Sequence, residues 1–259
     1  MSMGSTMRKM REISGRTRLA GLIGANTANS LSPKIHNFLA SCLGVDMVYT
    51  CFDVAPNGLK DAVFGAYAMG MAGLNITAPY KIAVMPHLDR LDTSAISTKA
   101  VNLLKYGNSG YTGYNTDIDG VLGALTHFHV EGISSATILG NGGAAKAAKA
   151  ALEWLGCGDI TILHRQPLTH NGDLLINATS ATPSELAATI PLCQLEKFGC
   201  IFDMNYPEKN PWLDQANRAG IKTFDGKTML VFQAVRAFEI LWDVNVSYET
   251  ANEILSNII

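Results

Sequence analysis

The chain has 259 residues, of which 47% are hydrophobic and 16% charged, a composition that indicates a compact globular protein and excludes a disordered one. Its net charge of −2 gives no reason to expect a nucleic-acid partner. It shows no apolar run long enough for a membrane span and no signal peptide. Five scattered cysteines and six histidines without ligand spacing predict a cytoplasmic protein with reduced thiols and no metal.

Predicted strands alternate with predicted helices after a polar lead at residues 1–17. The strands are "LAGLIG", "MVYTCFDV" and "GLNITAP", and the helices that follow the first two are predicted to end at Gly44 and Gly70. Helical sequence then runs through "YKIAVMPHLDRLDTSAISTKA", interrupted at Pro86. This alternation predicts an α/β fold with parallel strand pairing.

The stretch "GLNITAPYK", residues 73–81, places polar side chains along an apolar strand. Alternation puts Asn75 and Thr77 on one face, and the turn after Pro79 could bring Lys81 to the same end of the strand. For a lysine considered alone, a solvated surface position is the ordinary alternative.

A glycine turn at residues 140–145 provides the clearest motif. In "SATILGNGGAAKAAKAALEW", Gly140, Gly142 and Ala145 fit the dinucleotide pattern G-x-G-x-x-G/A between a predicted strand and a predicted helix. Glycines allow the backbone to approach a pyrophosphate, and the helix that begins near Ala144 directs its amides at the phosphates. A tight structural turn is the alternative. The predicted cofactor contacts here are Gly140, Asn141, Gly142, Gly143 and Ala144.

The strand after that helix ends at His164 and Arg165. An acidic residue at this position would bind the ribose 2′-hydroxyl of NAD, whereas Arg165 suits the 2′-phosphate of NADP. A surface arginine remains the alternative.

Eight motifs, in order along nearly the whole chain, resemble those of the shikimate dehydrogenase family. They are "NSLSPKIHN", "GLNITAPYK", "AVN", "GYNTDIDG", "GNGGAAKA", "INATS", "DMNYPEKNP" and "GKTMLVFQAVRAFEILW". The resemblance implies a shikimate-binding α/β domain with a parallel-rich sheet, formed by residues 18–117 and 228–259. It also implies an NADP-binding Rossmann domain at residues 118–227 and a C-terminal helix that returns to the first domain.

The resemblance also assigns roles to single residues. Lys81 and Asp117 match the family's catalytic pair, with Lys81 as proton donor and Asp117 as its orienting partner. The implied reaction is the reversible NADPH-dependent reduction of 3-dehydroshikimate to shikimate, in the biosynthesis of aromatic amino acids. The implied substrate-binding residues are Ser30, Ser32, Asn75, Thr77, Asn102, Tyr206 and Gln233. The cofactor site would add His164, Arg165, Asn177 and Thr179 to the glycine turn. Without the family order, Ser32 and Pro33 could simply cap a helix, and Gln233 could be an exposed position.

Four departures separate the chain from the family pattern. Asn26 and Asn29 replace the usual proline and histidine, no threonine follows Asn102, and no glycine-methionine pair follows "INATS". The largest departure is a deletion, because only "QPLTHNG" separates Arg165 from "DLLINAT". A crossover with a helix needs at least ~10–12 residues, so the Rossmann half is predicted to be trimmed near the adenosine.

Several alternatives remain open from the sequence. The trimmed region predicts weak cofactor affinity and makes NAD a possible substitute for NADP. Quinate or an aminated shikimate is an alternative substrate, since one ring substituent differs. A non-catalytic shikimate-binding protein is the rival outside the enzyme class, although binding alone needs no proton donor such as Lys81. The expected partner is a small molecule, and the expected oligomeric state is a monomer or homodimer.

Overall fold

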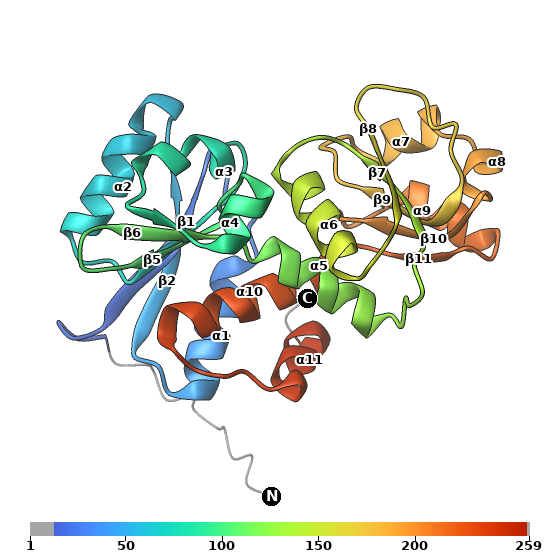
Figure 1. Cartoon of the computed structure of the whole chain (residues 1–259). Coiled ribbons are helices and arrows are strands. Elements are labelled where there is room, and N and C mark those ends of the chain that lie inside the picture. The colour runs from blue at the N-terminus through green and yellow to red at the C-terminus, as the bar shows by residue number, and fades with distance from the viewer. Residues whose placement is uncertain (1–12, 258–259) are drawn as a thin grey trace, which may run out of the picture.

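The computed structural model of the chain describes residues 13–257, and within this range the strands form two sheets with helices on both faces (Figure 1). The six-stranded sheet consists, in spatial order, of β2 (Met47–Asp53), β1 (Arg18–Gly24), β3 (Gly73–Ile76), β5 (Leu103–Tyr106), β6 (Tyr111–Tyr114) and β4 (Arg90–Leu91). The five-stranded sheet consists of β11 (Lys222–Phe224), β10 (Phe198–Asp203), β9 (Gly172–Asn177), β7 (Ser135–Leu139) and β8 (Asp159–Leu163). The predicted α/β fold is confirmed.

The six-stranded sheet is mixed rather than wholly parallel. β1 pairs in parallel with β2 and β3, whereas β5 runs antiparallel between β3 and β6. Helices α1 (Ser32–Leu43), α10 (Lys227–Trp242) and α11 (Tyr248–Asn257) share a core with β1 and β2, and α2 (Leu59–Ala68) belongs to a second core on this sheet. The C-terminal helix therefore returns to the first sheet, as predicted.

The predicted glycine stops are found, but the segment after β3 differs from the prediction. Gly44 caps α1 in the left-handed region, and Gly70 has a φ of +69° just after α2. The sequence predicted one helical segment interrupted at Pro86, but residues 80–98 form four short elements instead. They are α3 (Tyr80–Ala83), the 3₁₀ helix η2 (Met85–His87), β4 and α4 (Thr93–Thr98). The Asp92 carboxylate accepts a hydrogen bond from the Ser94 amide and starts α4 anew, so tertiary pairing and a new cap override the helical sequence.

The five-stranded sheet is wholly parallel. On one face lie α5 (Asp117–His127) and α6 (Gly143–Trp154), and on the other lie α7 (Pro183–Thr189), α8 (Leu192–Leu195) and α9 (Pro211–Arg218). A Rossmann sheet has the classic strand order 3-2-1-4-5-6. In this sheet β7 corresponds to strand 1 and β8 to strand 2. Since β8 is an edge strand, the sheet has no counterpart of strand 3 among the described residues. Residues 164–171 cross from β8 to β9 without a helix, as the short connection predicted, and the buried Leu168 anchors this crossover.

The two halves are joined by helix packing as well as by the chain. Helix α5 packs against both α10 and α6, so it contacts elements of each half. None of the described helices is long and apolar enough to cross a membrane. The predicted domain boundaries, residues 18–117 with 228–259 and residues 118–227, stay a prediction. Of the predicted lead, residues 1–12 lie outside the described residues, and residues 13–17 form no helix or strand.

His36 is a titratable group in the core of the first half. Its ring stacks on Tyr49, with centroids 4.2 Å apart and planes within 2° of parallel. Neither ring nitrogen has a hydrogen-bond partner among residues 13–257. Complete burial lowers the pKa of His36 from 6.5 to about 3, so the folded protein holds this imidazole neutral.

This burial predicts acid sensitivity. Below pH 6.5 the unfolded chain protonates His36 and the folded chain does not, so the free energy of unfolding should fall as the pH drops from 6.5 toward 3. The expected slope is about 1.4 kcal/mol per pH unit. Urea unfolding at several pH values would measure it. His36→Phe should flatten the dependence and the exposed His170→Phe should not; equal slopes in all three proteins would contradict the assignment.

Candidate active site

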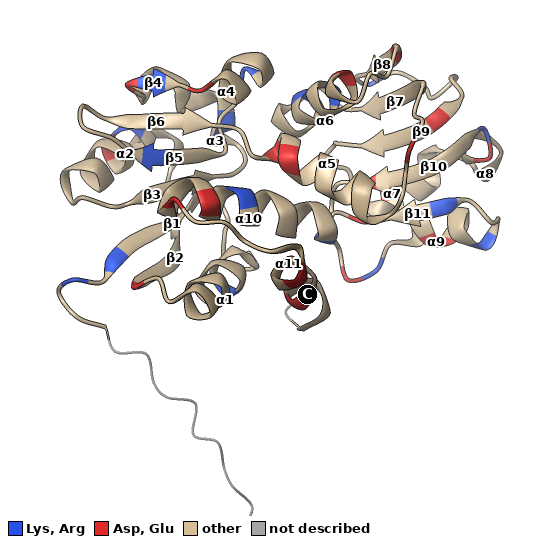
Figure 2. Cartoon of the chain, turned by 60° about the horizontal axis from the view of Figure 1, so that its bottom comes forward, with Lys and Arg blue, Asp and Glu red and all other residues tan. Residues whose placement is uncertain are grey.

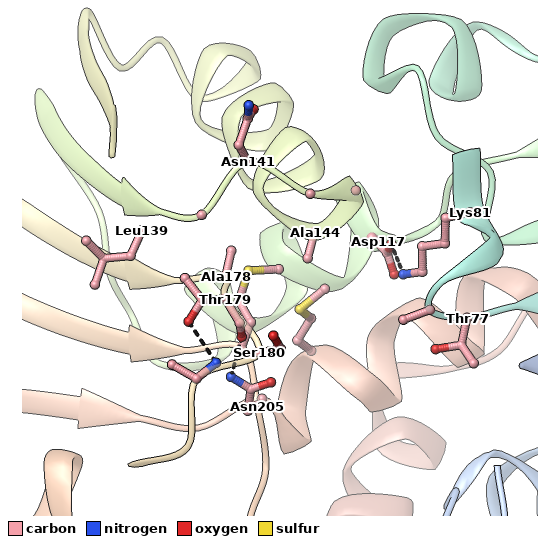
Figure 3. Close-up of a pocket in the computed structure, with 18 of the residues that line it drawn as sticks. Thr77, Lys81, Asp117, Leu139, Asn141, Ala144, Ala178, Thr179, Ser180 and Asn205 are labelled. Atoms are coloured by element: carbon pink, nitrogen blue, oxygen red, sulfur yellow. Dashed lines mark hydrogen bonds and ion pairs between the residues drawn. The ribbon is translucent and has the colours of Figure 1, made fainter. Parts of the chain in front are cut away.

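A cavity of about 1130 Å³ opens between the carboxyl ends of the two sheets (Figure 3). Of the site residues predicted from the sequence, only Asn177 does not line it. Those that line it are Ser30, Ser32, Asn75, Thr77, Lys81, Asn102, Asp117, Gly140, Asn141, Gly142, Gly143, Ala144, His164, Arg165, Thr179, Tyr206 and Gln233. Carboxyl ends of parallel strands are the usual place for a ligand in α/β folds, and here both sheets contribute.

An ion pair forms the centre of the cavity. The Lys81 Nζ atom lies 2.5 Å from Asp117 Oδ2, and Asn102 Nδ2 donates to the other carboxylate oxygen at 2.9 Å. Figure 3 shows Lys81 and Asp117 pointing toward one another, and Figure 2 shows the acidic start of α5 between the two sheets. The Asp117 side chain is only 5% exposed, whereas the Lys81 side chain is 21% exposed. Lys81 therefore keeps access to the cavity, with protons left to donate.

The turn before α5 is fixed by amide side chains. Asn102 Oδ1 accepts from the Thr116 backbone amide at 2.7 Å, and Asn115 Oδ1 accepts from the Asp117 amide at 3.0 Å. Asn115 Nδ2 in turn donates to the Ala100 carbonyl at 3.0 Å. These bonds tie the "AVN" and "NTD" segments together and hold the carboxylate toward Lys81.

Two serines line the cavity beside the start of α1. Ser30 Oγ accepts from the Ser32 amide at 3.2 Å. Ser32 is the first residue of α1, whose N-cap is Leu31, so the Ser32 hydroxyl does not act as the cap. The structure therefore does not support the alternative in which the Ser32 hydroxyl caps the helix.

Two predicted substrate contacts come from the C-terminal third of the chain. Gln233 is half-buried on α10, and its amide nitrogen donates to the Leu230 carbonyl at 2.9 Å, so it is not the exposed position that the alternative required. Tyr206 lies in the loop after β10 with 37% of its surface exposed.

The glycine turn is shaped as a phosphate loop. Gly140 has a φ of +113°, and a Cβ there would lie 2.8 Å from the Ala178 carbonyl oxygen, so only glycine fits. A Cβ on Gly142 would meet no described atom within 4 Å, which leaves space for a ligand. The N-cap of α6 is Gly142, and no side chain in the described chain caps this helix, so its first amides face the cavity.

The phosphate loop also meets the ion pair. A Cβ on Gly143 would lie 3.4 Å from Lys81 Cδ, so the glycine turn of the second half comes close to the lysine alkyl chain of the first. The glycine turn and Lys81 therefore line neighbouring parts of one cavity.

The far end of the cavity is formed by the crossover after β8. Arg165 is exposed and has a φ of +56°, so the chain turns away from the strand at this residue. Asn177 is fully buried beneath the cavity, where its Oδ1 accepts from the Thr179 hydroxyl at 2.7 Å and its Nδ2 donates to Asp203 at 2.9 Å. Its contact with a cofactor stays a prediction, and its visible role is to support Thr179.

The sequence prediction missed several residues of the cavity wall. Met204 and Asn205 directly follow β10, and Met229 and Leu230 lie on the first turns of α10. The position of Met204 and Asn205 after a parallel strand was an available signal. Met229 and Leu230 gave no such signal in the sequence, because an apolar face of a helix predicts packing in the core and not a ligand contact.

Comparison with known proteins identifies the family. Residues 22–104 match the family model described as "Shikimate dehydrogenase substrate binding domain". A relative from Citrifermentans bemidjiense named "Shikimate dehydrogenase (NADP(+))" is 35% identical, over 88% of this chain and 91% of its own length. The chain belongs to the shikimate dehydrogenase family. The resemblance predicted from the motifs is thereby confirmed.

Solved structures of family members share the whole fold. A chorismate mutase/shikimate 5-dehydrogenase fusion protein from Clostridium acetobutylicum has a TM-score of 0.86 at 31% identity, covering 93% of this chain and 96% of that one. Shikimate 5-dehydrogenase from Thermus thermophilus, in complex with NADP(H) and shikimate, has a TM-score of 0.82 at 26% identity, covering 93% and 100%. The predicted combination of an α/β domain with a Rossmann domain agrees with these family members.

The two glycines of the turn give a matched stability test. Gly140→Ala should lower the free energy of unfolding by about 1–3 kcal/mol, because it puts a Cβ on a left-handed backbone against the Ala178 carbonyl. Gly142→Ala should have little effect, because that residue has a φ of −82° and open space around it. Urea unfolding would measure both, and equal losses would contradict the different backbone constraints.

Proposed function

We propose that this protein is an NADP-dependent shikimate dehydrogenase that catalyses the reversible reduction of 3-dehydroshikimate to shikimate. The observation that carries the proposal is the Lys81–Asp117 pair beside a phosphate-loop backbone. Family membership, and relatives named as NADP(+) enzymes, support the same activity.

The cavity residues fit a dinucleotide. The free space at Gly142, the left-handed Gly140 and the uncapped amides of α6 make a site for the pyrophosphate. His164, Arg165 and Thr179 would hold the rest of the cofactor, with Arg165 beside the 2′-phosphate. When bound, NADPH supplies the hydride for the reduction.

The chain's own residues would handle the proton and the charge. Lys81 would donate a proton to the oxygen of the reacting carbonyl, and its ammonium would stabilise the alkoxide that develops there. Asp117 holds the ammonium in position, and Asn102 fixes Asp117 through the second carboxylate oxygen. In the reverse direction the same lysine recovers the proton from the hydroxyl.

The remaining polar residues suit a small carboxylated triol. Ser30 and Ser32 present hydroxyls near the start of α1, where a carboxylate would also meet the positive end of the helix. Tyr206 would assist the two serines at the carboxylate. Neutral donors and acceptors for the ring hydroxyls or the carboxylate would come from Asn75, Thr77, Asn102 and Gln233. A pocket of this kind rejects analogues that lack a hydroxyl, because its own polar groups would be left unpaired.

The helix-free crossover favours one further possibility. Within residues 13–257, no helix lies between β8 and β9 in the chain, and no further strand pairs with β8 at the edge of the sheet. The adenosine end of the site is therefore enclosed by fewer elements than in an intact Rossmann domain. A shikimate-binding protein with little or no turnover, or with NAD in place of NADP, is therefore the second candidate. Quinate and aminated shikimate remain alternative substrates. A cytoplasmic location and a monomeric or homodimeric state stay predictions.

Absorbance at 340 nm tests the proposal directly. The wild-type protein should reduce NADP when shikimate is added, and Lys81→Met should lower kcat by about 10²–10⁴ while changing shikimate affinity much less. Methionine keeps an alkyl chain beside Gly143 and removes the proton donor. Calorimetry with shikimate would report the affinity.

Lys105→Met is the matched control, because Lys105 is also ion-paired, to Asp243 at 2.6 Å, but lies outside this cavity. It should keep the wild-type kcat. Shikimate binding without turnover in the wild type would support the non-catalytic candidate, whereas full turnover in Lys81→Met would show that this lysine is not the proton donor.

Cofactor choice tests Arg165. If its guanidinium contacts the 2′-phosphate, Arg165→Ala should lower kcat/KM for NADP relative to NAD by about 10–150-fold, the equivalent of one charge-assisted contact. The KM for NADP should be high even in the wild type, because the adenosine end is trimmed. Arg218→Ala, an exposed arginine on α9 away from the cavity, should leave the ratio unchanged. Equal efficiency with both cofactors in the wild type would show that Arg165 does not select NADP.

A further inference from the structure

Tyr49 lies directly behind one of the residues expected to bind substrate. Its hydroxyl donates to Asn75 Oδ1 at 2.8 Å, and the pair is buried. Asn75 lines the cavity, but Tyr49 does not and is only 2% exposed. Tyr49 therefore reaches the cavity only through another side chain.

The hydrogen bonds around Asn75 fix which way its amide points. Asn75 Nδ2 lies 3.2 Å from the Asn102 carbonyl, which can only accept a hydrogen bond, so the nitrogen must face it. The amide oxygen then faces Tyr49, whose hydroxyl supplies the proton. One N–H and one lone pair of Asn75 remain for a ligand.

Tyr49 is itself held from two sides by neighbouring residues of α1. Its ring stacks on His36 at 4.2 Å. Its backbone, on the edge strand β2, donates to Asn37 Oδ1 at 3.1 Å and accepts from Asn37 Nδ2 at 2.9 Å. Ring and backbone are both fixed, so the hydroxyl has a defined position.

The hydroxyl stays a donor across the physiological range. Burial raises the pKa of Tyr49 well above its usual value, and the nearby Ser32 hydroxyl opposes that shift only in part. Ser32 is itself a cavity residue, so Tyr49 lies close to two predicted substrate contacts.

We propose that Tyr49 is a positioning residue for the substrate, which acts by holding the Asn75 amide in one orientation toward the cavity. This inference rests on the proposed shikimate dehydrogenase function and adds a residue to its substrate half. Because Lys81 and Asp117 keep their own partners, Tyr49 governs substrate affinity and leaves the proton transfer to that pair.

Tyr49→Phe tests the inference, because it removes one hydroxyl and keeps the stack on His36. The KM and calorimetric Kd for shikimate should rise about 3- to 10-fold, as expected for one lost hydrogen bond with an unpaired acceptor left behind. The kcat and the KM for NADP should stay within about twofold of the wild type.

Tyr111→Phe is the matched control. It removes another buried tyrosine hydroxyl of the same sheet, one that donates to the Met71 carbonyl at 3.0 Å and lies away from the cavity. Tyr111→Phe should lower the free energy of unfolding in urea about as much as Tyr49→Phe does. It should leave the KM for shikimate unchanged. A similar rise in KM in both variants would reduce Tyr49 to a structural role and overturn the proposal.

A double mutant shows whether Tyr49 acts through Asn75. In an Asn75→Ala background, Tyr49→Phe should add little further loss of shikimate affinity, because the group that it positions is gone. The full 3- to 10-fold loss in that background would overturn the mechanism.

Calorimetry separates the two proposals. Shikimate binding without turnover in the wild type would refute the proposed activity and still allow the Tyr49 comparison, whereas an unchanged Kd in Tyr49→Phe would refute the Tyr49 proposal alone. Neither binding nor turnover in the wild type would refute both.

Discussion

The buried carboxylate of Asp117 is the constraint around which the cavity is organised. A carboxylate with so little contact to water is stable only when its charge and its lone pairs are matched, and here Lys81 and Asn102 supply those partners. Lys81 follows β3, Asn102 precedes β5, and Asp117 begins the helix that leads into the second half. Three separate segments must therefore converge within hydrogen-bond distance, and a change in any of them leaves a charge or a buried lone pair without its partner.

Local sequence patterns predicted several residues that line this cavity. Strand alternation predicts that Asn75 and Thr77 share a face, and a phosphate loop requires the glycines Gly140 and Gly142. The place of Lys81 in the site came from the family resemblance. Their positions in the cavity agree with those predictions, while their roles toward ligands stay predictions.

What the sequence could not predict depends on contacts between distant segments. Nothing local marks Tyr49 as a partner of Asn75, because that bond requires β2 and β3 to flank β1 in a particular register. Gly226 looks like an ordinary turn glycine, yet a Cβ there would collide with the Met204 carbonyl oxygen. The helical prediction for the segment after β3 was wrong for the same reason. The strand β4 forms by pairing with β6, and no local sequence pattern marks that pairing. Hydrophobic periodicity predicts which face is buried, but it does not identify what that face meets.

The return of α10 and α11 to the first sheet fixes the order in which the two cores can be completed during synthesis. The core shared by α5, α6 and the second sheet needs no residue beyond Met229. The core on β1 and β2 still lacks Phe238 and Ile254 when that point is reached, although its first strand is among the earliest segments made. On a ribosome, which delivers the chain from its N-terminus, the half that begins first must finish last. Until α10 and α11 emerge, this core lacks some of its buried residues, so the first half is the one that depends on the C-terminal helices.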